Sequence, residues 1–489
     1  MFLNVVLKRI HKPLLRSAAL SLGLVPAVHG ADLMSIYQSA QSNDPQYRGA
    51  QQATQVTRQQ SRQLRSAYLP QLNLEVQRIE TDQTVISSDN QIFQQGNANY
   101  GTDDMSLNLT QPVLRWDRIE GWKQSRLQEK QAETRQAQAT QTLQVRVAEA
   151  YFGALAARDA VILSRAELAS ATRQYEDADA RFRRGLARRT DQLDAQARMA
   201  QVEAELGAKQ NAWEDALEAL RELTGTKPDD LKPVARELPL AAPDPLPVES
   251  WIKSANDGNV EIQVQRLAVE IADREVERQR AGHYPTLDLR VRHNEHTTDG
   301  SLFGGGSETE SDEITLALNV PIYSGGSVWS KRKEAAARHA QSKDELERVR
   351  REVERQTRAA YQGLLSAIRR AKALEQAVKA QELAVETKRR GFQAGLYTST
   401  TVLDAEEDLY ADRYEYALAR YDYLVNWVKL RRATGQLSAA DLAALNGQLV
   451  SPLAEPEPEA GATPSAAPAP AGATPEMAPA EAAPAQPAQ

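Results

Sequence analysis

The sequence contains no cysteine among its 489 residues, which excludes disulfide bonds, thiol catalysis and thiolate metal sites. Aromatic residues are also scarce, at 6%, whereas Ala, Gln, Arg and Glu are abundant. This composition favours long helices and coiled coils over a thick globular core. The formal net charge is −7, a mild acidity that argues against a nucleic-acid-binding protein.

No hydrophobic run approaches the roughly 20 residues that a membrane-spanning helix requires. A shorter apolar stretch, Ser17 to Val28, precedes a plausible cleavage point at Ala31. It follows a basic segment that contains Lys8, Arg9, Lys12 and Arg16. This pattern predicts a secretory signal peptide over residues 1–30. We therefore expect an exported protein that can enter a membrane only through strands.

Proline is absent from two long stretches, Val113 to Lys227 and Ile322 to Ser451. Apolar or small residues recur there at alternating spacings of four and three, from Leu143 to Phe182 and from Val353 to Phe392. A period of 3.5 residues predicts left-handed coiled-coil packing. A helix from about Trp116 to Arg184 would be roughly 100 Å long. Shorter helices are expected at Leu33 to Ser66 and at Thr190 to Thr224.

The second half of the chain repeats the first at an offset of about 210 residues. For example, Ala150-Tyr151-Phe152-Gly153 aligns with Ala360-Tyr361-Gln362-Gly363. We expect two structural repeats, at residues 31–226 and 250–450, joined by a Pro-rich linker at 227–249. The tail at 451–489 is rich in Pro and Ala and is expected to be disordered.

Each repeat is predicted to contain a pair of strands, at about 68–113 and 283–322. Apolar residues alternate there with polar ones: Leu72, Leu74 and Val76; Met105, Leu107 and Leu109; Leu287, Leu289 and Val291; Ile314, Leu316, Leu318 and Val320. One such strand also fits a half-buried soluble sheet, but four in an exported chain are typical of transmembrane strands. The polar segments Thr81 to Asn99 and His293 to Asp312 are expected to be exposed loops. Four strands cannot close a barrel, so several copies would have to combine their strands.

The end of the second repeat and the start of the mature chain carry distinctive motifs. These are Gly395-Leu396, Thr401-Val402-Leu403-Asp404-Ala405, Tyr421-Asp422-Tyr423-Leu424 and Gly435-Gln436-Leu437, together with Asp32-Leu33-Met34 and Asn43-Asp44-Pro45. In these motifs, and over nearly the whole mature chain, the sequence resembles the TolC family of outer-membrane efflux and secretion channels. The resemblance implies a mainly α-helical homotrimer. Its 12-stranded transmembrane β-barrel, with four strands per chain, would continue into a periplasmic α-helical barrel that ends in a coiled-coil tip.

The resemblance also implies a function. The protein would be the exit duct of a tripartite efflux or type I secretion system in the outer membrane, in contact with lipid and extending into the periplasm. It would work with a periplasmic adaptor (membrane fusion) protein and an inner-membrane RND or ABC transporter. The sequence itself contains no phosphate loop, nucleophile motif or metal cluster, so we expect neither an enzyme nor a protein that uses a cofactor or metal. The alternative is a periplasmic coiled-coil scaffold that forms no pore.

Site residues follow from the same resemblance. The turns that contain Gly185, Leu186, Gly395 and Leu396 would dock the adaptor, although the glycines could serve only to turn the chain. The family narrows its pore with two carboxylates, of which Thr401 replaces the first and Asp404 remains. Further acidic residues at the constriction would be Asp191 and Asp194, and gating contacts would involve Tyr397, Arg188 and Arg189. A ring of Asp404 carboxylates would favour cations, whereas a lone helical aspartate is often only a solvated surface charge.

Overall fold

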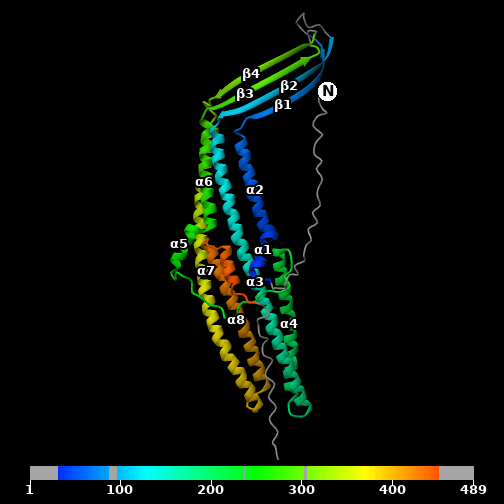
Figure 1. Cartoon of the computed structure of the whole chain (residues 1–489), viewed down its shortest axis with the longest axis vertical. Helices are drawn as coiled ribbons and strands as arrows, with labels where there is room; N and C mark the ends of the chain where they lie inside the picture. Colours follow the sequence, from blue (N-terminus) through cyan, green and yellow to red (C-terminus); the bar gives the residue numbers. More distant parts are fainter. Residues whose placement is uncertain (1–30, 88–95, 236, 302–304, 451–489) are drawn as a thin grey trace, which may run out of the picture.

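The computed structural model describes residues 31–87, 96–235, 237–301 and 305–450. The molecule is elongated, with a four-stranded sheet at one end and long helices running away from it (Figure 1). The segments expected to be a signal peptide and a disordered tail lie outside the described residues. Within the described residues, no helix is both long and apolar enough to cross a membrane.

The first half contains four helices and two strands. Their bounds are α1 (Leu33–Asn43), α2 (Pro45–Ser66), β1 (Gln71–Val85), β2 (Gly96–Leu114), α3 (Trp116–Arg183) and α4 (Arg189–Thr224). The long helix predicted from about Trp116 is confirmed as α3. The single helix expected from Leu33 to Ser66 is wrong, because the chain breaks at Asp44. A residue before proline disfavours helical geometry, and Pro45 instead starts α2, capped by the Asp44 carboxylate that accepts from the Tyr47 N–H at 2.8 Å.

The second half gives the same order of helix, strand pair, long helix and shorter helix. Its elements are α5 (Val248–Gly258), α6 (Val260–Arg280), the 3₁₀ turn η1 (Ala281–His283), β3 (Thr286–Thr298), β4 (Ser307–Asn319), α7 (Ser327–Gln393), α8 (Ser399–Ala433) and α9 (Ala439–Asn446). Asn259 separates α5 from α6 and caps the latter. Its side chain accepts from the N–H groups of Glu261 and Ile262 and donates to the Ala433 carbonyl at 2.8 Å.

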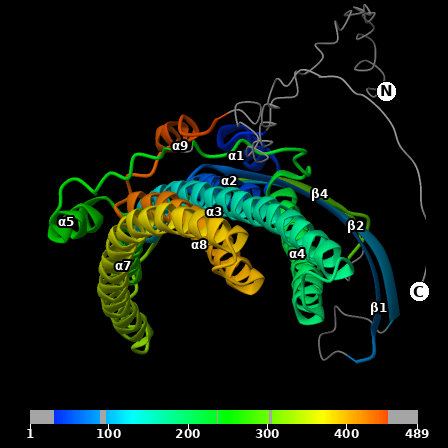
Figure 2. The ribbon, with the colours of Figure 1, turned by 90° about the horizontal axis from the view of Figure 1, so that it is seen from below.

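The four strands form one antiparallel sheet in the order β1-β2-β3-β4. Leu74 lies opposite Leu107, and Leu289 lies opposite Leu316, so the predicted apolar residues share one face. Leu74 and Leu316 are each 64% exposed on that face. Ser106, which points to the other face, is buried, and the sheet is visibly curved in Figure 2. Alternation of apolar and polar faces is therefore confirmed.

The strands are longer than predicted, so the expected loops are too wide. β1 continues to Val85 and β2 begins at Gly96. In the second pair, β3 continues to Thr298 and β4 begins at Ser307. The central residues of both loops, 88–95 and 302–304, lie outside the described residues. These strand ends are polar on both faces and therefore lack the alternation that identifies a strand. Cross-strand pairs such as the His293 Nδ1 and Asp312 Oδ1 atoms, 2.8 Å apart, line the added ladder.

The helices form a wall beneath the sheet. α2 packs beside α3, α3 beside α6, and α6 beside α7, while α4 and α8 continue the wall away from the sheet (Figures 1 and 2). The wall therefore has two open edges, α2 on one side and α7 on the other. The open strands β1 and β4 lie on the same respective sides, since β1 follows α2 and β4 precedes α7.

The main hydrophobic core lies at the waist of the molecule. Tyr151 and Phe152 of α3 are fully buried, and the Phe152 ring stacks on Tyr421 of α8 with centroids 6.2 Å apart. The Tyr421 hydroxyl donates to Asp159 Oδ2 at 2.6 Å. The segment after α4 crosses this core, where Tyr151 donates to the Lys232 carbonyl at 2.8 Å. The waist thus joins both halves of the chain through α3 and α8.

Replacing Asn259 by alanine tests the junction between the halves. We expect the N–H groups of Glu261 and Ile262 to exchange with solvent at least about tenfold faster. The substitution removes the helix cap and the bond to α8 together, a loss of roughly 2 kcal/mol in local stability. Hydrogen exchange measures this directly. Asn426→Ala is the control, since within the described residues its amide donates to the Asp422 carbonyl of its own helix. Equal exchange in both variants would contradict the assigned role.

Candidate functional site

The end of the molecule farthest from the sheet consists of two helical hairpins. Gly185 follows α3 with φ of 72°, and Gly395 follows α7 with φ of 75°. The Leu186 N–H donates to the Arg181 carbonyl at 2.9 Å, and the Leu396 N–H donates to the Gly391 carbonyl at 2.8 Å. This left-handed closure satisfies the last carbonyls of each helix. It leaves the leucine side chains 75% and 77% exposed, so each turn presents an apolar tip to solvent.

The structure spreads the predicted constriction residues over both hairpins. Asp191 is the third residue of α4, and its carboxylate accepts from the Arg188 N–H at 3.2 Å. Thr401 bonds to Thr398 through its hydroxyl at 2.8 Å. Asp194 and Asp404 are exposed, and in the described part of the chain neither carboxylate makes a hydrogen bond or an ion pair. Within one chain, Asp191 and Thr401 thus take part in local caps at the starts of their helices.

The predicted gating residues are also placed locally. The side chains of Arg188 and Arg189 are exposed. The Tyr397 ring folds back onto its own hairpin, where it covers Gly391 so closely that a Cβ atom at that position would collide with it. The fit requires glycine at 391, a residue that sequence reasoning did not single out.

Sequence reasoning also missed a buried carboxylate that joins three helices. Glu406 of α8 is only 5% exposed. It accepts from Ser170 Oγ at 2.5 Å and from Gln174 Nε2 at 2.6 Å, both on α3. On α7, the Arg389 guanidinium lies 2.6 Å from the other carboxylate oxygen. Hydrogen bonds to an ionised group are about twice as strong as neutral ones. The one sequence feature that could have identified Glu406 is that an acidic residue stands among the apolar positions that α8 buries.

A second polar link lies nearby. Arg198 of α4 lies 2.8 Å from Glu167 of α3 and 2.9 Å from Glu407 of α8. Burial raises the pKa of Glu167, while the Arg198 guanidinium opposes that rise. We call the bonds of Glu406 and Arg198 to their partners the tip clamp. The clamp ties the α3/α4 hairpin to the α7/α8 hairpin through charged groups.

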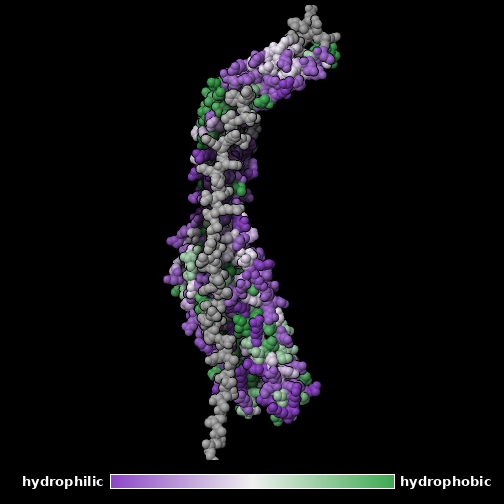
Figure 3. All heavy atoms as spheres, turned by 45° about the vertical axis from the view of Figure 1, so that its right-hand side comes forward, coloured by the Kyte–Doolittle hydropathy of each residue, from purple (hydrophilic) through white to green (hydrophobic). Residues whose placement is uncertain are grey.

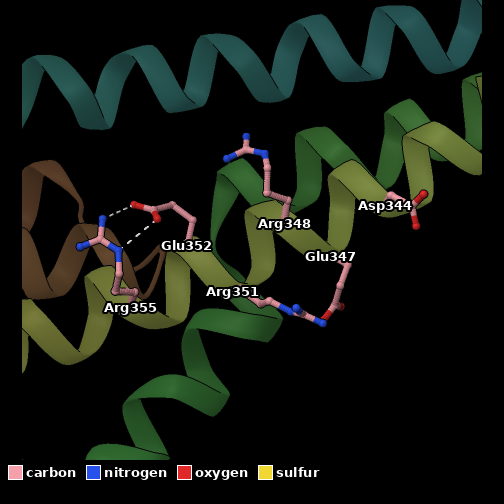
Figure 4. A pocket seen from close by; sticks show the side chains of 6 residues that line it. All are labelled: Asp344, Glu347, Arg348, Arg351, Glu352 and Arg355. Atoms are coloured by element: carbon pink, nitrogen blue, oxygen red, sulfur yellow. Dashed lines mark hydrogen bonds and ion pairs between the residues drawn. The ribbon is translucent and has the colours of Figure 1, made fainter.

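A separate hollow of about 520 Å³ lies along α7 (Figure 4). It is lined only by charged side chains: Asp344, Glu347, Arg348, Arg351, Glu352 and Arg355. Ion pairs within the helix join Glu352 to Arg355 at 2.5 Å and Glu347 to Arg351 at 2.9 Å. These pairs make this a charged, exposed face of the open edge α7, as expected for a solvated coiled-coil surface.

The four-stranded sheet, the long helices and the paired hairpins define a class of protein, the outer-membrane efflux channels. The chain belongs to the outer membrane efflux protein family, whose sequence profile matches residues 36–226 and 251–436. It is 31% identical over 441 residues to the outer membrane protein TolC of Vibrio cholerae, an alignment covering 89% of this chain and 98% of that protein. It is 30% identical to the alkaline protease secretion protein AprF of Pseudomonas aeruginosa, over 90% of this chain and 89% of the relative.

Solved structures share the fold. The outer membrane protein VceC of Vibrio cholerae superposes with a TM-score of 0.68 at 19% identity, covering 82% of this chain and 96% of that one. The predicted resemblance to TolC channels is therefore confirmed. The protein is located in the outer membrane and extends into the periplasm, and it has the general role of an outer-membrane exit duct.

Removing the Glu406 carboxylate tests the tip clamp. We expect Glu406→Ala to accelerate hydrogen exchange in α8 near the turn, because Ser170, Gln174 and Arg389 lose a shared acceptor. The local loss is about 2 kcal/mol, since solvent partly compensates the half-exposed Arg389. Asp408→Ala is the matched control and should change exchange little, because Asp408 contacts Gln381 of α7 within its own hairpin and is not part of the tip clamp. Similar exchange in both variants would rule out a special role for Glu406.

Proposed function

We propose that three copies of this chain form one channel. Four strands from each copy would make a 12-stranded transmembrane β-barrel, continuous with a periplasmic α-helical barrel built from two repeats per chain. The channel would be the exit duct of a tripartite efflux or type I secretion system. A periplasmic adaptor protein and an inner-membrane RND or ABC transporter would deliver its cargo.

The coincidence of the open edges carries this proposal. β1 and α2 lie at one side of the chain, and β4 and α7 at the other. Pairing β4 of one copy with β1 of the next would therefore bring α7 beside the next α2. Such a head-to-tail interface forms a closed ring when the rotation between copies is right. Closure would also satisfy the backbone groups of both edge strands, which lipid cannot do.

The outward face of the sheet supports insertion in lipid. Leu74 and Leu107 lie in one row across the sheet, and the next residue in that row, on β3, is His293. On β3 and β4 the apolar band lies closer to the helices, at positions such as Leu289 and Leu316. The band thus shifts along the strands from one side of the sheet to the other. Strands that are tilted in a barrel need such a stagger to keep a level apolar belt.

The hairpin end would form the gate. Asp404, with Thr401, Asp191 and Asp194, would line the constriction, and Tyr397, Arg188 and Arg189 would shape the contacts around it. The tip clamp would hold the two hairpins of each chain together in the closed channel. The exposed turns at Gly185, Leu186, Gly395 and Leu396 would receive the adaptor.

Single-channel recording in a planar lipid bilayer tests the pore. We expect discrete and uniform conductance steps that prefer cations, and Asp404→Ala should lower the preference several-fold because three negative charges leave one ring. Asp408→Ala is the matched control, since Asp408 contacts Gln381 of α7 in its own hairpin. If folded, oligomeric protein fails repeatedly to insert, the channel proposal is wrong.

Charging the outward face separates a channel from a periplasmic scaffold. Leu74→Arg should reduce insertion into the outer membrane, because an arginine on the lipid-facing side costs roughly 2–4 kcal/mol near the bilayer midplane. Asn73→Arg places the same charge on the opposite face of the same strand and should be tolerated. Membrane fractionation and the yield of assembled oligomer measure both effects. A scaffold would tolerate the two substitutions equally.

A further inference from the structure

Exposed apolar and aromatic side chains gather where the helices meet the sheet. Between β4 and α7, Ile322 and Tyr323 are 95% and 87% exposed, and Trp329 follows in the first turns of α7. Leu69, between α2 and β1, is exposed at the other edge. Figure 3 shows hydrophobic residues at this junction. Such residues mark the level of the lipid headgroups, here those of the periplasmic leaflet.

Five cations lie at the same level on the two open edges. They are Arg62 and Arg65 near the end of α2, and Lys331, Arg332 and Lys333 near the start of α7. All five are exposed, and within the described residues none forms an ion pair. Lys333 Nζ lies 3.9 Å from the centroid of the Trp329 ring. Cations in the first turns of a helix oppose its dipole, so helix stability does not explain the three on α7.

The joint between α3 and α6, inside the chain, gives a direct comparison. There, Glu120 forms ion pairs with Lys123 at 2.6 Å and with Arg274 at 3.7 Å. Glu275 forms an ion pair with Arg278 at 2.8 Å. Lys123, Arg274 and Arg278 are therefore neutralised by acidic residues of the same chain.

The joint between copies lacks these acidic residues. At the offset of about 210 residues, Ser330 takes the place of Glu120 and Lys333 that of Lys123. Aligned on the prolines before β1 and β3, Gln60 takes the place of Glu275 and Arg62 that of Glu277. α2 contains no acidic residue at all. Ring closure would thus bring two cationic helix ends together, and the acidic residue beside them on α7, Glu334, lies 2.6 Å from Arg338 of its own helix.

We propose that anionic phospholipids of the periplasmic leaflet bind at each joint between copies, with their headgroups between α7 of one copy and α2 of the next. The headgroup phosphates supply the missing negative charge, and the acyl chains lie against the apolar face above. Basic clusters beside a membrane attract anionic lipids in this way. The inference rests on the proposed ring of copies. It adds that the stability of this ring against dissociation depends on anionic lipid.

The test compares full-length protein in nanodiscs of phosphatidylcholine alone with protein in nanodiscs containing phosphatidylglycerol. We expect phosphatidylglycerol to slow thermal dissociation of the oligomer, and native mass spectrometry should find it enriched on the oligomer by about tenfold over its share of the bilayer. The variant Lys331→Gln/Arg332→Gln/Lys333→Gln should lose both effects. Inorganic phosphate added to phosphatidylcholine nanodiscs separates lipid binding from simple anion binding.

The matched control is Lys343→Gln/Arg350→Gln/Arg351→Gln, which removes the same charge from the same helix farther from the membrane. It should keep the lipid preference. A wild-type oligomer that conducts but shows no preference for phosphatidylglycerol would overturn this inference and leave the channel intact. Stabilisation by free phosphate alone would also overturn it. A protein that forms no oligomer in any lipid would instead contradict the proposed function.

Discussion

The backbone groups at the edge of a sheet need partners, and the hydrocarbon of a membrane provides none. This constraint governs the molecule, because one chain supplies only β1 to β4 and leaves both outer strands open. The helices share the same two open sides, since each edge strand is joined directly to an edge helix. A single head-to-tail contact between copies would therefore close the sheet and the helical wall together.

The sequence predicts the regular parts of this fold well. Long runs without proline and with a 3.5-residue period identify α3 to within one residue of each end. Alternation finds all four strands, but only where one face is apolar, because polar pairs such as His293 with Asp312 carry no alternating signal. The break at Asp44 was readable from the following proline. It was missed because the period of the helix continues across it.

The candidate site was less accessible to sequence reasoning. The acidic residues near the turns were visible, yet the local use of Asp191 as a helix cap depends on the geometry of the turn. Glu406 was overlooked because its importance arises only where α3, α7 and α8 meet. A carboxylate in a helix sequence indicates a solvated surface until tertiary packing buries it and brings Arg389 within reach.

The distribution of contacts along the molecule indicates where motion is easiest. At the waist, buried Tyr151, Phe152 and Tyr421 hold α3 and α8 together through apolar and aromatic packing. Near the turns, the two hairpins are joined by the polar tip clamp and by Arg181 of α3, which lies over the Phe392 ring of α7 at 4.9 Å. Regions with few buried apolar contacts open at lower free energy than the core. We therefore expect that separating the two hairpins near the turns costs less free energy than opening the waist, where the Tyr421 core is close-packed.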